Sequence, residues 1–219
     1  MGRIGLDPLL FMSAAIVGLL ISPWAGAADT PQARSRFKEG RHYVVLETPA
    51  RLPGSRVEVV EVFWYGCSHC YALDTVVEAW RVKGKPAYVD FKRVPGTVNE
   101  LARTHARLFY TVKALRRLDD LHTALFREIN EGVRLGTFKQ FSEFVGRYGV
   151  GADAFQQAYR SEAVTKEVER AVALNRSYLI DKVPTLIVNG KYKTDLVLAE
   201  DGRQLLAIVN ELAAREHGR

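Results

Sequence analysis

The chain of 219 residues has little cysteine, and its only two cysteines, Cys67 and Cys70, are near neighbours. This placement argues against a stabilising disulfide framework, because a bridge gains most by closing a long loop and this pair closes almost none. A structural zinc site is also disfavoured, since it needs four ligands and usually a distant second pair. The sequence therefore favours redox chemistry at the two thiols over a structural bridge or a metal site.

Basic charge is not concentrated in any one tract. The chain carries 31 Lys and Arg against 25 Asp and Glu, for a formal net charge of +6, but Arg116 and Arg117 are followed at once by Asp119 and Asp120. Scattered charge of this kind is typical of a solvated surface, so we expect no nucleic-acid partner. Long polar tracts are missing as well, and 47% hydrophobic residues are typical of a folded globular chain.

Long apolar runs are missing too, apart from residues 9–21 near the amino terminus. This run is followed by Pro23 and the small residues 25–28, and it is shorter than the roughly 20 residues that a membrane-spanning helix needs. The pattern predicts a secretory signal peptide over residues 1–27, cleaved after Ala27, with an uncleaved anchor helix or a buried core helix as alternatives. Export would place the cysteines in an oxidising compartment, where a disulfide persists.

A strand-helix-strand pattern surrounds the cysteines. Residues 57–63 are rich in β-branched side chains and nearly all apolar, which predicts a central strand covered on both faces and makes Glu61 conspicuous. Apolar residues then recur at helical spacing over 73–80, and residues 87–94 alternate as a second strand. A shorter strand is predicted at 43–46. This order of elements is typical of α/β proteins with a parallel sheet.

The middle of the chain is predicted to be helical. From about residue 98 to 179 there is no strand pattern, only amphipathic runs interrupted by glycines. Residues 185–188 then form a strand-like run that ends in an Asn-Gly pair, which is typical of a hairpin turn, and 191–193 begin the returning strand. An amphipathic helix is predicted over 204–215.

The motif Cys67-Ser68-His69-Cys70 lies where the predicted strand ends and the helix begins. Unpaired N–H groups and the positive end of the helix dipole would stabilise a thiolate on Cys67. Cys67 would then be the sulfur that is attacked and released, with Cys70, one turn further in, as its resolving partner. An imidazole at His69 would favour the charged, reduced form, although an exposed loop histidine without a role is the alternative.

A second signal is Val183-Pro184, directly before the strand at Thr185. Proline is tolerated at the start of a strand, so a simple strand-entry residue is one interpretation. The other is a cis-proline, since cis peptide bonds are largely confined to proline. In thioredoxin folds a cis-proline at this point packs beside the dithiol and aligns the substrate chain.

Two segments, EVFWYGCSHC at 61–70 and KVPTLIVNGKY at 182–192, together resemble the DsbA family of periplasmic disulfide oxidases. The resemblance implies an α/β, thioredoxin-like fold with a helical domain inserted between the βαβ unit and the cis-proline β-hairpin. The implied domains are a thioredoxin-like first part over 28–97, the inserted helical domain over 98–179, and a thioredoxin-like second part over 180–219.

The resemblance also implies catalytic roles for four residues. Cys67 matches the exposed nucleophile, and Cys70 matches its buried partner in the redox-active disulfide. His69 matches the histidine that helps to stabilise the thiolate. Glu61 matches a buried acid beneath the dithiol that serves proton transfer during turnover; the alternative is a strand glutamate whose carboxylate reaches solvent at the sheet edge.

Three further residues are expected to bind substrate. Pro184 matches the cis-proline, and Val183 matches the substrate-facing residue before it. Ser68 departs from the pattern, because the family usually has proline there. Since the dipeptide between the cysteines tunes thiolate stability, this departure leaves the redox potential open, and we expect an oxidising but milder enzyme.

The expected function is therefore donation of the Cys67-Cys70 disulfide to unfolded exported proteins with free thiols. The resemblance implies reoxidation by a DsbB-type, quinone-linked membrane oxidase, a periplasmic location, a monomer, and no bound cofactor or metal. The alternatives are a thiol reductase or isomerase, and a peptide-binding, chaperone-like module with an idle disulfide. Loss of activity on changing Cys67 to serine would separate an oxidase from a binding module.

Overall fold

The structure is a computed structural model, and it describes residues 1–2, 35–47 and 56–218. The chain divides into two units, Met1–Arg34 and Ser35–Arg219. The predicted signal peptide over 1–27 and its cleavage site lie outside the described residues. No helix within the described part of the chain is both long and apolar enough to cross a membrane.

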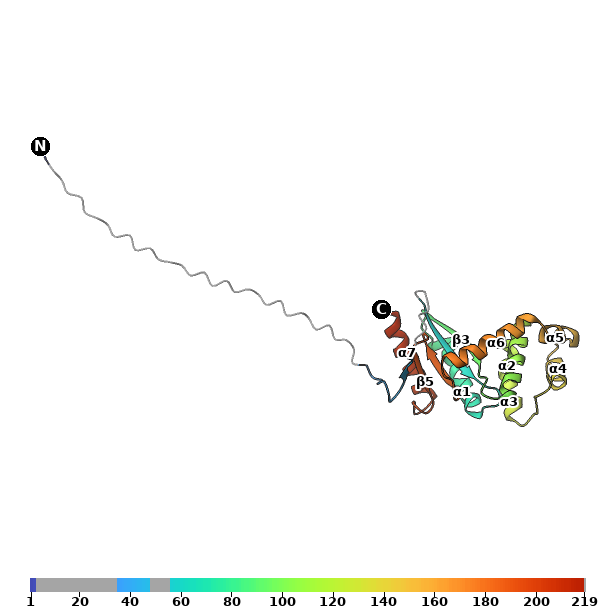
Figure 1. Cartoon of the computed structure of the whole chain (residues 1–219). Helices are drawn as coiled ribbons and strands as arrows, with labels where there is room; N and C mark the ends of the chain where they lie inside the picture. Colours follow the sequence, from blue (N-terminus) through green and yellow to red (C-terminus); the bar gives the residue numbers. More distant parts are fainter. Residues whose placement is uncertain (3–34, 48–55, 219) are drawn as a thin grey trace. The chain divides into compact units, whose positions relative to one another are not determined.

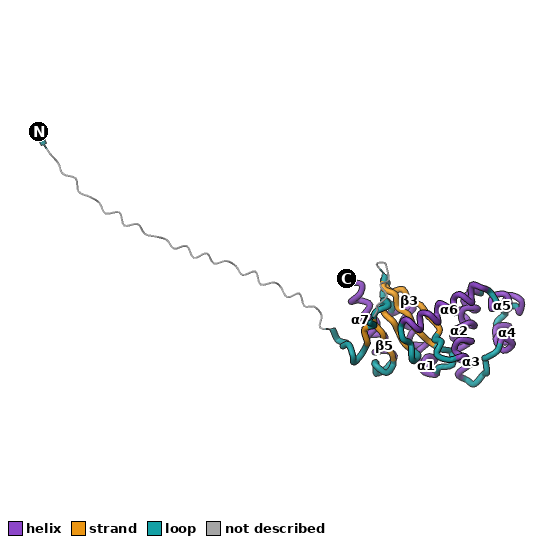
Figure 2. The backbone as a smooth tube through the Cα atoms, in the orientation of Figure 1, coloured by secondary structure: helices purple, strands orange, loops and turns teal. Residues whose placement is uncertain are grey.

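The second unit is built on a five-stranded sheet with the strand order β1-β5-β4-β2-β3. Strands β2 and β3 are parallel, whereas β2 pairs antiparallel with β4, and β5 pairs antiparallel with both β4 and β1. The strands are β1 (Val44–Val45), β2 (Val57–Phe63), β3 (Val89–Pro95), β4 (Thr185–Val188) and β5 (Tyr192–Asp195). The strands are drawn as arrows in Figure 1 and in orange in Figure 2.

Strand β2 is central, as its apolar sequence predicts, because it lies between β3 and β4. On one face Val59 packs into a core with side chains of helices α1 (Ser68–Ala79) and α7 (Gly202–His217). On the other face Val60 packs with Tyr178. Burial on both faces explains why five of the seven side chains of the strand are apolar and why the buried Glu61 needs a partner.

Five helices lie between β3 and β4 in the sequence, and Figure 2 shows them as a group beside the strands. They are α2 (Glu100–Ala114), α3 (Leu118–Asn130), α4 (Phe138–Arg147), α5 (Ala152–Tyr159) and α6 (Glu162–Ser177). Their shared core holds buried aromatic rings, among them Phe109, Phe126 and Phe155, and it continues to Tyr65 and Cys70. The helical block therefore forms part of the packing under the dithiol.

The loop that follows α6 contains an unusual backbone conformation at Leu179, which has φ +47° and a side chain that is 71% exposed. Glycine is preferred at this position after a helix, because a left-handed conformation costs other residues about 1 kcal/mol. We expect Leu179→Gly to raise the free energy of unfolding by up to about 1 kcal/mol in urea denaturation. Leu179→Ala, which keeps the strain, should change it little; equal stabilisation by both variants would contradict this explanation.

Candidate functional site

The two cysteines lie at the turn from β2 into α1. Cys67 is the N-cap of α1, has an extended backbone conformation, and its sulfur accepts a hydrogen bond from the backbone N–H of Cys70 at 3.4 Å. Cys67 is partly exposed, whereas Cys70 is fully buried, and both are free thiols. The cap position places the sulfur of Cys67 at the positive end of the helix, as the sequence predicts.

The environment separates the proton affinities of the two thiols. A hydrogen bond from the Cys70 thiol, followed by the backbone N–H groups of Cys70 and His69 and the charge of His69, lowers the pKa of Cys67 from 9.0 to about 6, although partial burial opposes this. Burial, reinforced by the neighbouring Cys67, raises the pKa of Cys70 far above its usual range. Cys67 is therefore the stable thiolate and Cys70 the persistent thiol.

These pKa values predict a titration that can be followed by the ultraviolet absorbance of the thiolate. The reduced protein should titrate with a midpoint of about 6, and the oxidised protein should show no such transition. Cys70→Ala should raise the midpoint more than His69→Gln, because the hydrogen bond from Cys70 is the largest cause of the shift. A midpoint near the ordinary pKa of cysteine would contradict stabilisation by the helix terminus.

The lowered pKa of Cys67 also determines how the stability of the reduced protein depends on pH. A thiol whose folded-state pKa lies below its unfolded-state pKa stabilises the folded, reduced protein above the unfolded value. This stabilisation is lost as the pH falls through about 6. The reduced form should therefore gain stability relative to the oxidised form as the pH rises from about 6 towards 9, which paired denaturation curves of the two forms would measure.

The substrate-binding residues expected from the sequence lie around the same sulfur. The Val183-Pro184 peptide bond is cis, and the carbonyl oxygen of Val183 is 3.5 Å from Sγ of Cys67. Gly96 leaves room for the side chain of Val183, because a Cβ at this position would lie 2.9 Å from Cγ1 of Val183. Ser68 is exposed on the first turn of α1. The structure thus brings two chain segments that are distant in sequence together at Cys67.

Glu61 lies on β2 and is only 1% exposed. Its carboxylate does not reach solvent at the sheet edge; it accepts a hydrogen bond from Nε of Arg93 at 2.9 Å. Burial is the largest effect on this group and raises the pKa of Glu61, with the charge of Arg93 acting in the opposite direction. Burial therefore favours the protonated form of this carboxyl, from which a stronger base can take the proton.

Arg93 joins Glu61 to two further acids on α1. It donates from Nη2 to Asp74 at 3.0 Å and from Nη1 to Glu78, and its side chain is only 13% exposed. We call these four residues, Glu61, Asp74, Glu78 and Arg93, the buried charge cluster; it was not predicted from the sequence. One signal was present: a glutamate inside a buried strand requires a buried cation, and Arg93 is on the paired strand.

The arrangement can perform thiol-disulfide exchange with residues of the chain alone. It provides one sulfur of low pKa at the surface, one buried thiol of high pKa, and a buried acid on the adjoining strand. Among the residues that the structure describes, no group of three His, Cys, Asp or Glu side chains is placed to hold a metal ion.

Comparisons with known proteins point to one family. The model of the DSBA-like thioredoxin domain matches residues 87–207. The thiol:disulfide interchange protein DsbA of Azotobacter vinelandii is 38% identical over 94% of this chain and 98% of its own length, and the protein of that name from Pseudomonas aeruginosa is 34% identical over 82% and 86%.

Solved structures agree with the sequence relatives. The crystal structure of Pseudomonas aeruginosa DsbA has a TM-score of 0.79 at 33% identity and covers 83% of this chain and 95% of that one. The oxidoreductase DsbA from Xylella fastidiosa has a TM-score of 0.75 at 27% identity and covers 83% and 98%. The fold class predicted from the sequence is confirmed. The chain belongs to the DsbA-like family and is a thiol:disulfide oxidoreductase with a thioredoxin-like fold.

Proposed function

We propose that this protein donates the disulfide formed by Cys67 and Cys70 to exported proteins as they fold. The observation that carries this direction is the position of Cys67 at the N-terminus of α1, where its sulfur accepts a hydrogen bond from the N–H of Cys70 and its pKa is lowered. A stable thiolate in the reduced protein favours reduction of the disulfide, so the oxidised protein tends to pass its bond to a client. The relatives' shared name, thiol:disulfide interchange protein, agrees with this chemistry.

The exchange proceeds through a mixed disulfide. A client thiolate attacks Sγ of Cys67, the Cys67-Cys70 bond breaks, and the sulfur of Cys70 takes a proton from Glu61. A second client thiolate then attacks the client sulfur, and Cys67 leaves as a thiolate. The client has lost two electrons and gained a disulfide, and the protein has gained both electrons. The high pKa of Cys70 supports a proton donor in the first step.

The residues around Cys67 are proposed to orient the client chain. The carbonyl of Val183 lies beside the reacting sulfur, where it can accept a hydrogen bond from the backbone of an extended client, and Pro184 fixes that segment at the start of β4. His69 adds positive charge near the thiolate. Ser68 is exposed beside both and is proposed to contact the client.

The cell must reoxidise the reduced protein after each turnover. We propose a periplasmic location and a quinone-linked membrane oxidase of the DsbB type as the oxidant, with the protein acting as a monomer. These proposals rest on membership of the DsbA-like family and on the predicted signal peptide. Oxygen consumption by membranes that contain or lack such an oxidase, measured with the reduced protein as electron donor, would test the proposed oxidant.

The equilibrium of the purified protein with glutathione redox buffers tests the direction of transfer. The fraction of the Cys67-Cys70 disulfide is followed by alkylation and mass measurement. We expect a reduction potential well above that of thioredoxin, which is about −270 mV. A value at or below that of thioredoxin would contradict the oxidase and favour a reductase or a stable structural bond.

A further inference from the structure

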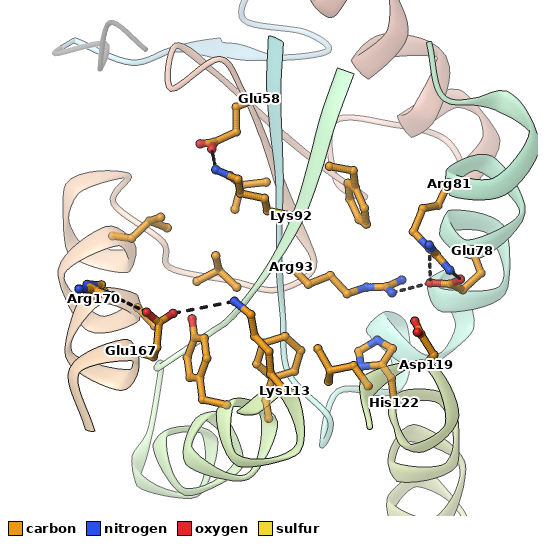
Figure 3. A pocket seen from close by; sticks show the side chains of 18 of the residues that line it. Glu58, Glu78, Arg81, Lys92, Arg93, Lys113, Asp119, His122, Glu167 and Arg170 are labelled. Carbon is orange, nitrogen blue, oxygen red and sulfur yellow. Dashed lines mark hydrogen bonds and ion pairs between the residues drawn. The ribbon is translucent and has the colours of Figure 1, made fainter. Parts of the chain in front are cut away.

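The buried charge cluster opens on one side into a cleft of about 620 Å³. Figure 3 shows the cleft, with Arg93 reaching towards Glu78 and with His122 of α3 close by. All three residues line the cleft, and His122 is itself only 5% exposed. A buried histidine at the mouth of a cluster of acids has no part in the exchange steps described above.

Both ring nitrogens of His122 have polar neighbours. Nε2 is 3.4 Å from Oδ1 of Asp74 but makes no hydrogen bond within the described part of the chain, whereas Nδ1 is hydrogen-bonded at 2.9 Å to the hydroxyl oxygen of Tyr65. Because a carboxylate only accepts hydrogen bonds, the neutral ring carries its proton on Nε2 and accepts at Nδ1 from the Tyr65 hydroxyl. Burial lowers the pKa of His122, which favours this neutral form.

The contacts of Asp74 extend this chain to Glu61. Oδ1 of Asp74 faces both Nε2 of His122 and Nη2 of Arg93, the latter at 3.0 Å. The same guanidinium donates from Nε to Glu61 at 2.9 Å. Tyr65 therefore donates to His122, the Nε2–H group of His122 faces Asp74, and Arg93 donates to both Asp74 and Glu61.

We propose that His122 is a positioning residue for disulfide exchange. With its Nε2–H group 3.4 Å from Asp74, it supplies part of the positive field that this carboxylate requires, and so leaves the guanidinium of Arg93 centred between Asp74 and Glu61. The proposal rests on the proposed function, because the proton held by Glu61 is the one passed to Cys70. His122 thus sets the proton affinity of Glu61 without touching the reacting sulfurs.

Charge balance explains why a neutral donor matters here. Arg93 faces three carboxylates, and Arg81 adds a second cation at Glu78 only. If Asp74 lost the N–H group that faces it from His122, it would draw Arg93 towards itself, and Glu61 would lose its hydrogen-bond partner in a buried site. The groups facing His122 from each packed element are Tyr65 before α1, Asp74 and Glu78 on α1, Arg93 on β3 and Asp119 on α3.

A matched pair of variants tests the proposal. In His122→Asn the amide can replace Nδ1 beside Tyr65 but cannot reach Asp74, whereas in His122→Gln the amide can replace Nε2 and still place an N–H group beside Asp74. The oxidised variants are mixed with a two-cysteine peptide over a range of pH, and the single-turnover rate is divided by the peptide thiolate concentration. The decline of this rate at high pH reports ionisation of Glu61.

We expect His122→Asn to move this decline upwards by about half a pH unit or more, which is about threefold in rate at one pH on the slope. His122→Gln should remain close to the unaltered protein, and in a Glu61→Gln background His122→Asn should have no further effect. Equal shifts in both variants, no shift in either, or a shift that persists with Glu61→Gln would overturn the proposal. Failure of the unaltered protein to oxidise the peptide would instead overturn the proposed function.

Discussion

Replacing Cys67 by serine is expected to abolish disulfide donation to a reduced two-cysteine peptide. The hydroxyl cannot form a disulfide, and the remaining Cys70 is fully buried with a strongly raised pKa, so it does not provide an alternative thiolate. The measurement is the appearance of oxidised peptide after mixing with an excess of protein. We expect no oxidation above the rate without protein.

Cys70→Ser provides the control for this loss. It keeps Cys67 and its position at the helix terminus, so it should still form a mixed disulfide with an activated peptide thiol and accumulate it, since no resolving thiol remains. Undiminished client protection by Cys67→Ser, measured as suppression of aggregation of a reduced unfolded protein, would favour the alternative of a peptide-binding module. Loss of oxidation with no such protection supports the oxidase.

Local patterns in the sequence predicted most of the architecture. The apolar run of β2, the helical spacing after Gly66 and the hairpin at Thr185 each depend on neighbours within a few residues, and each predicted element is present. The predicted strand at 43–46 is shorter in the structure, as β1 spans only Val44–Val45. Its pairing is antiparallel to β5, a contact between distant segments that no local pattern specifies.

The dithiol could be recognised from the sequence because its residues are contiguous. The buried charge cluster could not be, because its members come from β2, α1 and β3 and meet only after folding. Asp74 interrupts the apolar face of α1 beside Leu73, and Arg93 is placed in an alternating strand where a charge ordinarily faces water. Only Glu61 was conspicuous, since a charged side chain is rare in a strand buried on both faces.

The buried charge cluster and the dithiol share helix α1. Asp74 follows Cys70 by one turn on α1, so any movement of this helix changes both the cap at Cys67 and the contact with Arg93. Burial raises the pKa of Cys70 most, and the charge of Glu61 in the cluster adds a smaller effect in the same direction. Redox chemistry and folding stability are therefore coupled through one helix.

Arg93→Leu is expected to reduce the free energy of unfolding by about 3 to 5 kcal/mol at neutral pH, the range found when one partner of a buried ion pair is removed. The substitution leaves Glu61 and Asp74 buried without their cation. Urea denaturation of the oxidised protein measures the loss. Arg56→Leu is the matched control, because its pair with Asp90 is about half exposed on both sides and should contribute little to stability.

The loss of folding stability in Arg93→Leu should depend on pH. Burial already raises the pKa of Glu61 against the opposing charge of Arg93, so removing Arg93 raises it further, and the added penalty is complete above that raised folded-state pKa. The difference between the unaltered protein and Arg93→Leu should therefore shrink as the pH falls from neutral towards the unfolded-state value of about 4. Adding Glu61→Gln to Arg93→Leu should recover part of the loss at neutral pH, because it removes one uncompensated charge. A loss no larger than that of Arg56→Leu, or one independent of pH, would show that the carboxyls find solvent or another partner when Arg93 is absent.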